Sequence, residues 1–474
     1  MTKRPIRPAT AAVLLSLLLS GCAVGPDYVK PDLPVPGHWT GPAGSGPPDT
    51  AALEQWWRHF QDPVLDGLIR DALKANTDIA TARASLRESR ARRNLARATL
   101  GPSVNVSGSA GRTDSGQGLP ARENYSTGFD ASWEPDVFGG NRRALQAAEA
   151  DLQASGEALH ETQVSLAAEV ARDYIDLRTA ERRLAIAENN LSTQQELYAL
   201  TRWRRMAGLV SSLDESQALS LLQQTRAGLP SLRTSVVEAR YRLAILLAKP
   251  PGTLEARLSG KGGIPVAKSK IAVGIPADTL RQRPDVRAAE RKLAAQTARL
   301  GEAEAARWPS FKLSGSLGLA ALSAGDLFTG DAVNNSLLAG ITAPIFDSGR
   351  IRSNIAVQDA RLEQARIAYH ASVLTALQDV ENALVEVANT HQRRQQLSQA
   401  AATAQQTLTL ARQQYAAGLI DFQSVLDSQR TVLNLQDQLA ASTGNYSTAL
   451  VQLYKALGGG WTPAAVAGNS KGSS

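Results

Sequence analysis

The chain has 474 residues, a formal net charge of +7 and only 5% aromatic residues. Its apolar residues are mainly Ala and Leu, a composition typical of long helices with thin packing seams rather than of large globular cores. Part of the positive charge lies in Lys3, Arg4 and Arg7, in a segment that we expect to be removed, and the remainder is dispersed. Nucleic-acid binding is therefore not indicated.

Residues 1–21 are predicted to be a lipoprotein signal peptide. Basic residues precede an apolar run at residues 11–19, and small residues follow it, which is the layout of a secretory signal. The segment ends at the only cysteine, in Leu19-Ser20-Gly21-Cys22, and this motif resembles a bacterial lipobox. The resemblance implies cleavage before Cys22, lipidation of Cys22, and sorting to the outer membrane because Ala23 follows. The alternative is an ordinary signal peptide followed by a free thiol.

Residues 22–62 are predicted to form an extended arm and a short helix. Seven prolines lie between residues 23 and 50, and such a composition favours extended chain. An extended arm would let the lipid anchor reach along the body of the molecule. Asp62 or Asp66 is expected to cap a helix that continues to about Ala98. The short helix before it carries three residues interpreted as packing residues: Trp56, Trp57 and Phe60.

An internal repeat of about 210 residues organises the rest of the chain. PSVNVSGS at residues 102–109 reappears as PSFKLSGS at 309–316, and AGLVS at 207–211 reappears as AGLID at 417–421. Each repeat is predicted to run helix, two β segments, long helix, tip, long helix. We expect the following segments: repeat 1 at residues 63–262, repeat 2 at residues 275–461, and a flexible tail at residues 462–474.

The longest stretch without proline, residues 345–462, is predicted to form two long helices joined by a turn. Apolar residues recur there at spacings of four and three, which indicates a coiled-coil seam, for example at Val373, Leu377, Val380, Leu384 and Val387. At about 1.5 Å per residue, the first arm would be roughly 100 Å long. Repeat 1 should form a similar hairpin, kinked at Pro230. The alternative is an ordinary helical bundle.

The β segments alternate between apolar and polar residues. Apolar or larger residues occupy every second position of residues 125–133 and 311–319, and residues 337–343 repeat the pattern except at Leu338. This period suits a tilted transmembrane strand with one face in lipid and one in water. Four strands cannot close a barrel, and open sheet edges are not tolerated in lipid. If these strands cross a membrane, the chain must be an oligomer; otherwise they are surface hairpins of a soluble protein.

Five stretches resemble the outer membrane factors of tripartite export systems, which are TolC-like channels, and within them the lipoprotein branch that includes OprM and the nodulation-type exporters. These stretches are CAVGPDY at residues 22–28, WWRHFQDP at 56–63, RPDVRAAE at 283–290, PIFDSGR at 344–350 and LYKALGGGW at 453–461. The resemblance implies a mainly α fold with transmembrane β. Four strands from each chain of a homotrimer would form one twelve-stranded barrel, continued by a long α-helical coiled-coil barrel through the periplasm.

The function that this resemblance implies is a passive conduit from the periplasm to the exterior. An inner-membrane pump and a periplasmic adaptor would load it, and the outer membrane would hold its barrel and its lipid anchor. The pump sets the cargo, because a tunnel wall selects weakly. The alternative is a lipid-anchored coiled-coil scaffold without a pore, which the alternating strands disfavour.

No catalytic, cofactor or metal site is expected. The sequence shows neither a phosphate-binding loop nor a nucleophile elbow. The five histidines are scattered without metal-ligand spacing, at His38, His59, His160, His370 and His391.

The tips of the two hairpins are expected to dock the adaptor. The candidate residues are Gly208, Leu209 and Val210 in the first tip and Gly418, Leu419 and Ile420 in the second. The alternative is that each glycine only ends a helix.

The resemblance also implies a periplasmic gate near the tips. Its candidate residues are Asp214, Tyr415, Asp421, Asp427 and Arg430. Threefold symmetry would make each aspartate a ring of three carboxylates that repel one another, so closure would need partners such as Arg430 and Tyr415. Ser424 occupies a place where some members of the family carry a further aspartate. The alternative is that Asp427 and Arg430 form only a local surface pair on one helix.

Overall fold

The computed structural model describes residues 23–41, 53–114, 116, 121–260, 262–267 and 276–461. The predicted signal peptide, Cys22 and the predicted tail at 462–474 lie outside the described residues. The chain divides into two compact units. Unit 1 contains residues 1–33, 84–157 and 287–371, and unit 2 contains residues 34–83, 158–286 and 372–474.

A break at Asn76 separates the two helices that follow the arm. After η1 (Trp56–Phe60), Asp62 caps α3 (Pro63–Ala75) by accepting hydrogen bonds from the backbone N–H groups of Val64 and Leu65, as predicted. The prediction of a single helix to Ala98 is wrong, because α3 ends at Ala75 with Asn76 as its C-cap, and α4 (Thr77–Ala98) follows. The Asn76 side chain accepts from the N–H groups of Asp78 and Ile79 and donates to the Leu246 carbonyl. These bonds replace the helical continuation.

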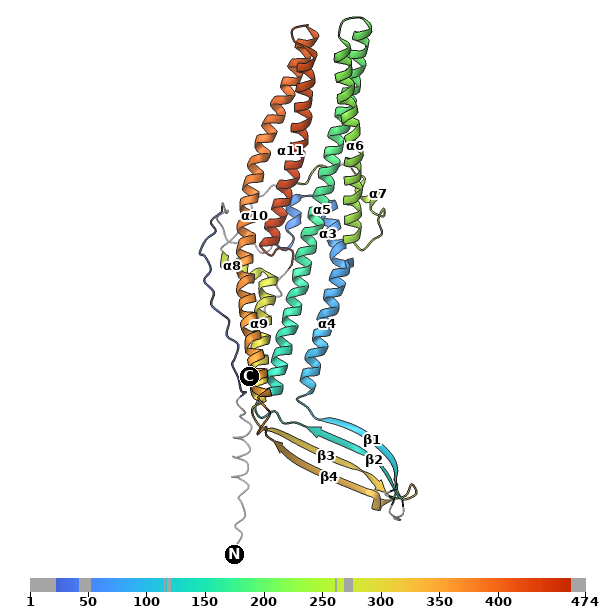
Figure 1. Ribbon diagram of the computed structural model, residues 1–474, viewed down its shortest axis with the longest axis vertical. Coiled ribbons are helices and arrows are strands. Elements are labelled where there is room, and N and C mark those ends of the chain that lie inside the picture. The colour runs from blue at the N-terminus through green and yellow to red at the C-terminus, as the bar shows by residue number, and fades with distance from the viewer. Residues whose placement is uncertain are drawn as a thin grey trace, which may run out of the picture. The chain divides into compact units, whose positions relative to one another are not determined.

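Two long helical hairpins dominate the structure, as predicted. The first consists of α5 (Gly140–Met206) and α6 (Ser212–Leu246), and the second of α10 (Arg350–Ala416) and α11 (Phe422–Ala456). The outgoing helices have 67 residues each and the returning helices 35 each, and α6 continues through Pro230. Figure 1 shows the two tips at the same end of unit 2.

Shorter helices lie between α6 and the β strands of repeat 2. They are α7 (Glu255–Leu258), α8 (Pro276–Gln282) and α9 (Pro284–Ala305). None of the described helices is both long and apolar enough to span a lipid bilayer.

Unit 1 holds one antiparallel sheet in the order β1-β2-β3-β4 (Figure 1). Its strands are β1 (Ser103–Thr113), β2 (Arg122–Trp133), β3 (Ser310–Ala321) and β4 (Val333–Thr342), and β4 follows the short η2 (Gly330–Ala332). Phe129 pairs with Val106 on one side and Leu317 on the other. The register therefore aligns the apolar positions of neighbouring strands on one face. Among the residues that the structure describes, no further strand pairs with the outer edges of β1 and β4.

The main hydrophobic core lies in unit 2 and joins the arm, η1, α3 and the inner segments of the long helices. Trp56 is fully buried and stacks on Tyr454 with ring centroids 5.1 Å apart. Arg178 is also buried in unit 2, and its guanidinium donates to the Tyr174 hydroxyl and to the Gly260 carbonyl. Burial raises the pKa of Tyr174 to about 12. This core fixes the connector between the repeats to α5.

Candidate functional site

Each outgoing helix ends in the same glycine-based motif. Gly208 has φ +70° and donates to the Arg205 carbonyl at 2.9 Å, while the N–H of Leu209 donates to Arg204 at 2.9 Å. In the second hairpin, Gly418 has φ +74°, and the corresponding bonds run from Gly418 to Tyr415 and from Leu419 to Gln414. This pair of bonds defines a Schellman motif. A Cβ atom at either glycine would meet no atom within 4 Å, so backbone conformation rather than space requires glycine.

Each returning helix begins with a cap made by one serine and one aspartate. The two residue types occupy opposite positions in the two caps. Ser211 is the N-cap of α6, and the Asp214 side chain reaches back to the Ser211 backbone N–H in a capping box. In the second tip, Asp421 is the N-cap of α11 and accepts from the N–H and hydroxyl of Ser424. The Ser424 hydroxyl and amide hold the pKa of Asp421 below its usual value. Both carboxylates therefore stabilise a helix start.

Asp427 and Arg430 lie on one exposed face of α11. Arg430 Nη1 donates to Asp427 Oδ1 at 3.3 Å, and the Gln423 amide donates to the same oxygen at 2.9 Å. In the single chain, this is the local pair that formed the alternative to the gate. Tyr415 contacts residues of both tips: the Arg204 guanidinium lies 4.9 Å from its ring centre, and Phe422 packs on it.

A small apolar core holds the two tips together within unit 2. Its buried members come from both returning helices, and side chains of both outgoing helices pack on it: Ala218, Leu221, Phe422 and Leu426, with Leu197, Tyr198 and Tyr415. Leu209 and Leu419 at the tips are exposed, whereas Val210 and Ile420 are half-buried. The tip residues thus divide into a packed set and an outward set.

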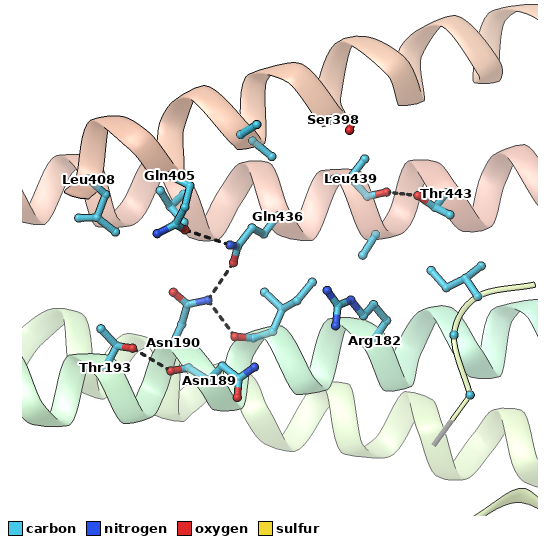
Figure 2. Close-up of a pocket in the computed structure, with 18 of the residues that line it drawn as sticks. Arg182, Asn189, Asn190, Thr193, Ser398, Gln405, Leu408, Gln436, Leu439 and Thr443 are labelled. Atoms are coloured by element: carbon cyan, nitrogen blue, oxygen red, sulfur yellow. Dashed lines mark hydrogen bonds between the residues drawn. The ribbon is translucent and has the colours of Figure 1, made fainter. Parts of the chain in front are cut away.

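Farther from the tips, polar contacts join the hairpins. Arg183 of α5 makes two hydrogen bonds to the Asp437 carboxylate of α11, at 2.7 and 3.0 Å. Figure 2 shows Gln436 of α11 between Gln405 of α10 and Asn190 of α5, with amide contacts of 3.4 and 3.5 Å. Asn190, Gln405 and Gln436 line a groove with a volume of about 920 Å³. Contacts of this length are weak and readily exchanged.

Sequence patterns did not predict these contacts between the hairpins. Arg183 and Asp437 are 254 residues apart, and Arg183 lies beside Glu181 and Arg182 on α5, so neighbours in the sequence do not identify its partner. Only the axial register of α5 against α11 selects this pair. The capping box at Ser211 could have been found, because Ser followed three residues later by Asp has the spacing of such a cap.

The tip geometry predicts opposite effects for two glycine substitutions in the first hairpin. Gly208→Ala should destabilise the tip by about 1–2 kcal/mol, because a residue with a Cβ is strained at positive φ. Gly228→Ala, at an open position inside α6, should stabilise the hairpin by about 0.5–1 kcal/mol. Thermal unfolding of the purified variants measures both changes. Equal shifts for the two variants would contradict the assigned role of Gly208.

Comparison with known proteins identifies the family. The family model for the outer membrane efflux protein matches residues 68–249 and 275–459. Nodulation protein T of Rhizobium leguminosarum bv. trifolii is 32% identical over 459 residues, covering 96% of this chain and 97% of that protein. Pyoverdine export outer membrane protein OpmQ of Pseudomonas aeruginosa is 32% identical over 460 residues, covering 94% and 95%. The solved outer-membrane channel OprN matches with a TM-score of 0.86 at 34% identity, covering 93% of this chain and 100% of that one. The chain therefore belongs to the outer membrane efflux protein family.

Proposed function

We propose that three copies of this chain assemble into one outer-membrane efflux channel, with a twelve-stranded barrel continued by a helical tunnel. The observation that carries this proposal is the sheet of unit 1, in which no strand of the described residues pairs with the outer edges of β1 and β4. Unpaired backbone groups in lipid cost several kcal/mol each, so only a closed barrel is stable there. Pairing β4 of one copy with β1 of the next leaves no open edge.

The two faces of the sheet suit the wall of a water-filled barrel. On one face, Val106 and Leu337 are 71% and 79% exposed, and Phe129 and Leu317 lie between them. The other face carries cross-strand polar pairs, including Ser107 with Asp130 and Ser316 with Ser336, each at 2.8 Å. Lipid would cover the first face and water the second. A scaffold without a pore would leave this apolar face in water, which disfavours that alternative.

The helical hairpins would form the periplasmic part of the conduit, and their tips would meet the adaptor of an inner-membrane pump. The repeated Schellman motif supports this role, because it presents Leu209 and Leu419 outward on rigid turns. We also propose lipidation of Cys22, whose sequence context resembles a lipobox. One relative is named for nodulation and another for pyoverdine export, at equal identity. The cargo of this chain therefore follows from its pump rather than from these similarities.

For the gate, we propose that the three Asp427 carboxylates of a trimer form one ring around the periplasmic opening. In the trimer, Arg430 would bridge from its own Asp427 to neighbouring copies when the opening closes. Its guanidinium reaches the carboxylate with one 3.3 Å bond, which leaves its other donors for a partner. Asp214 and Asp421 would act through their caps, by fixing where α6 and α11 begin.

Disulfide trapping tests the assembly of the barrel. In one chain, β2 and β3 separate β1 from β4, so residues of β1 and β4 lie about 14 Å apart, too far for a disulfide. Ser107→Cys combined with Asn334→Cys or Ser336→Cys should give disulfide-linked dimers and trimers at the matching register. Each single variant is the control. Monomers alone, from folded protein and across all such pairs, would contradict the trimeric barrel.

Removing the acylation site separates anchoring by lipid from anchoring by the barrel. Cys22→Ser should abolish incorporation of labelled fatty acid and slow maturation, while the barrel strands keep the protein in the membrane fraction. Fatty-acid labelling and membrane fractionation after carbonate washing measure the two effects. Complete release of the variant into the soluble fraction would count against a membrane-spanning barrel.

Single-channel conductance tests the gate. Asp427→Ala and Arg430→Ala should each raise the resting conductance, because the closing contacts between copies are lost. Glu88→Ala removes a comparable exposed ion pair on α4, with Arg92, and should leave conductance unchanged. If both α11 variants conduct like the unmodified protein, Asp427 and Arg430 form only a surface pair.

A further inference from the structure

The two hairpin tips share a backbone but present different surfaces. Gly208 corresponds to Gly418 and Ser211 to Asp421, so equivalent positions are 210 residues apart. The flanking positions Leu200 and Leu209 match Leu410 and Leu419, and all four side chains are exposed. At three other positions, an exposed large apolar residue of the first tip has a small or polar counterpart in the second: Trp203 against Gln413, Met206 against Ala416, and Leu213 against Gln423. Large apolar side chains at these positions thus occur only in the first tip.

In the first tip, five large apolar side chains at and beside the turn are exposed. Trp203, Met206 and Leu213 are 69%, 57% and 63% exposed. Leu200, Trp203 and Met206 follow one another at spacings of three, so they lie on one face of α5. The opposite face, with Leu197 and Thr201, is packed in the chain. We call this surface the Trp203 stripe, and it consists of Leu200, Trp203, Met206, Leu209 and Leu213.

Basic residues flank the stripe. Arg202 and Arg204 lie on either side of Trp203 along the helix, and Arg205 follows. Two of these guanidiniums have partners within the chain, since Arg204 lies over the Tyr415 ring and Arg205 forms an ion pair with Glu215. The stripe therefore has a positive border with a small net charge. At the second tip, only Arg412 occupies an equivalent basic position.

We infer that the Trp203 stripe selects the periplasmic partner, and that this partner is an adaptor's helical hairpin whose apolar ridge is flanked by carboxylates. This inference rests on the proposed docking function of the tips. A stripe at helical spacing fits the ridge of another helix, and Trp and Met are enriched in the cores of protein interfaces. The border of arginines complements acidic side chains. The stripe also continues into Leu209 of the proposed docking turn.

A consequence is that the six tips of a trimer are not equivalent. Three tips carrying the Trp203 stripe alternate with three tips that have Gln413, Ala416 and Gln423 in place of its Trp203, Met206 and Leu213. The glycine turns, which both tips share, form the part of the contact surface common to all six tips. The stripe distinguishes one partner from another. Specificity of this kind rests on a few large side chains in a wider contact surface.

The test removes the large apolar side chains from the first tip and compares the result with alanine substitutions at equivalent positions of the second tip. One variant combines Trp203→Gln, Met206→Ala and Leu213→Gln, and its control combines Gln413→Ala and Gln423→Ala in the second tip. The probe is the purified adaptor encoded with this channel, whose binding to immobilised full-length channel is measured at low and high salt. We expect the first variant to weaken binding at least tenfold at both salt concentrations, because the apolar contacts are lost while the arginines remain, and the control to change binding less than twofold.

Other outcomes would overturn the inference in distinguishable ways. Equal loss in both variants would show that the stripe is not selective. Loss of the trimer in the first variant would show that the stripe contacts another copy of this chain. The unmodified channel could instead bind phosphatidylglycerol vesicles that the first variant no longer binds, while both bind the adaptor equally. That result would assign the stripe to a membrane surface. Absence of adaptor binding to the unmodified channel, at both salt concentrations, would instead reject the proposed docking function.

Discussion

The four-stranded sheet is the constraint on which the rest of the account depends, because one chain cannot complete it. Each edge strand leaves backbone donors and acceptors unpaired, and lipid offers them no alternative partner. The apolar face, with Phe129 and Leu317 at its centre, adds a second requirement, since water is an unfavourable neighbour for it. In the proposed trimer, other copies of the chain would satisfy both requirements at once. Trimer assembly is thus part of folding in this account, and the channel is its consequence.

The internal repeat gives the helical part of the chain two nearly equal hairpins. The helices match in length, and both tips use the same Schellman turn. The caps show how the repeats diverged without changing the backbone: Ser211 and Asp214 in one tip correspond to Asp421 and Ser424 in the other, with hydroxyl and carboxylate exchanged. The turn is therefore under stronger physical constraint than the surface around it. Differences such as Trp203 against Gln413 are free to serve recognition.

Much of the fold could be predicted because its signals are local. The alternation at residues 311–319 and the seam around Val380 depend only on near neighbours in sequence, and both elements are present. The break at Asn76 was missed because its cause is an Asn side chain that bonds both the next helix and the distant Leu246 carbonyl. The Arg183–Asp437 contact requires the register between two helices, which no local pattern contains. For the same reason, the sequence could name Asp427 and Arg430 but could not say whether they pair within one chain or across copies.

The most direct test of the central claim is the mass of the intact, detergent-solubilised protein by native mass spectrometry. Closure of the sheet edges by other copies predicts a single dominant species containing three chains, which persists at low protein concentration. The predicted lipid on Cys22 would add to the mass of each chain without changing this ratio. A folded monomer that retains its strand content would contradict the account, because its sheet edges would then be stable without partners.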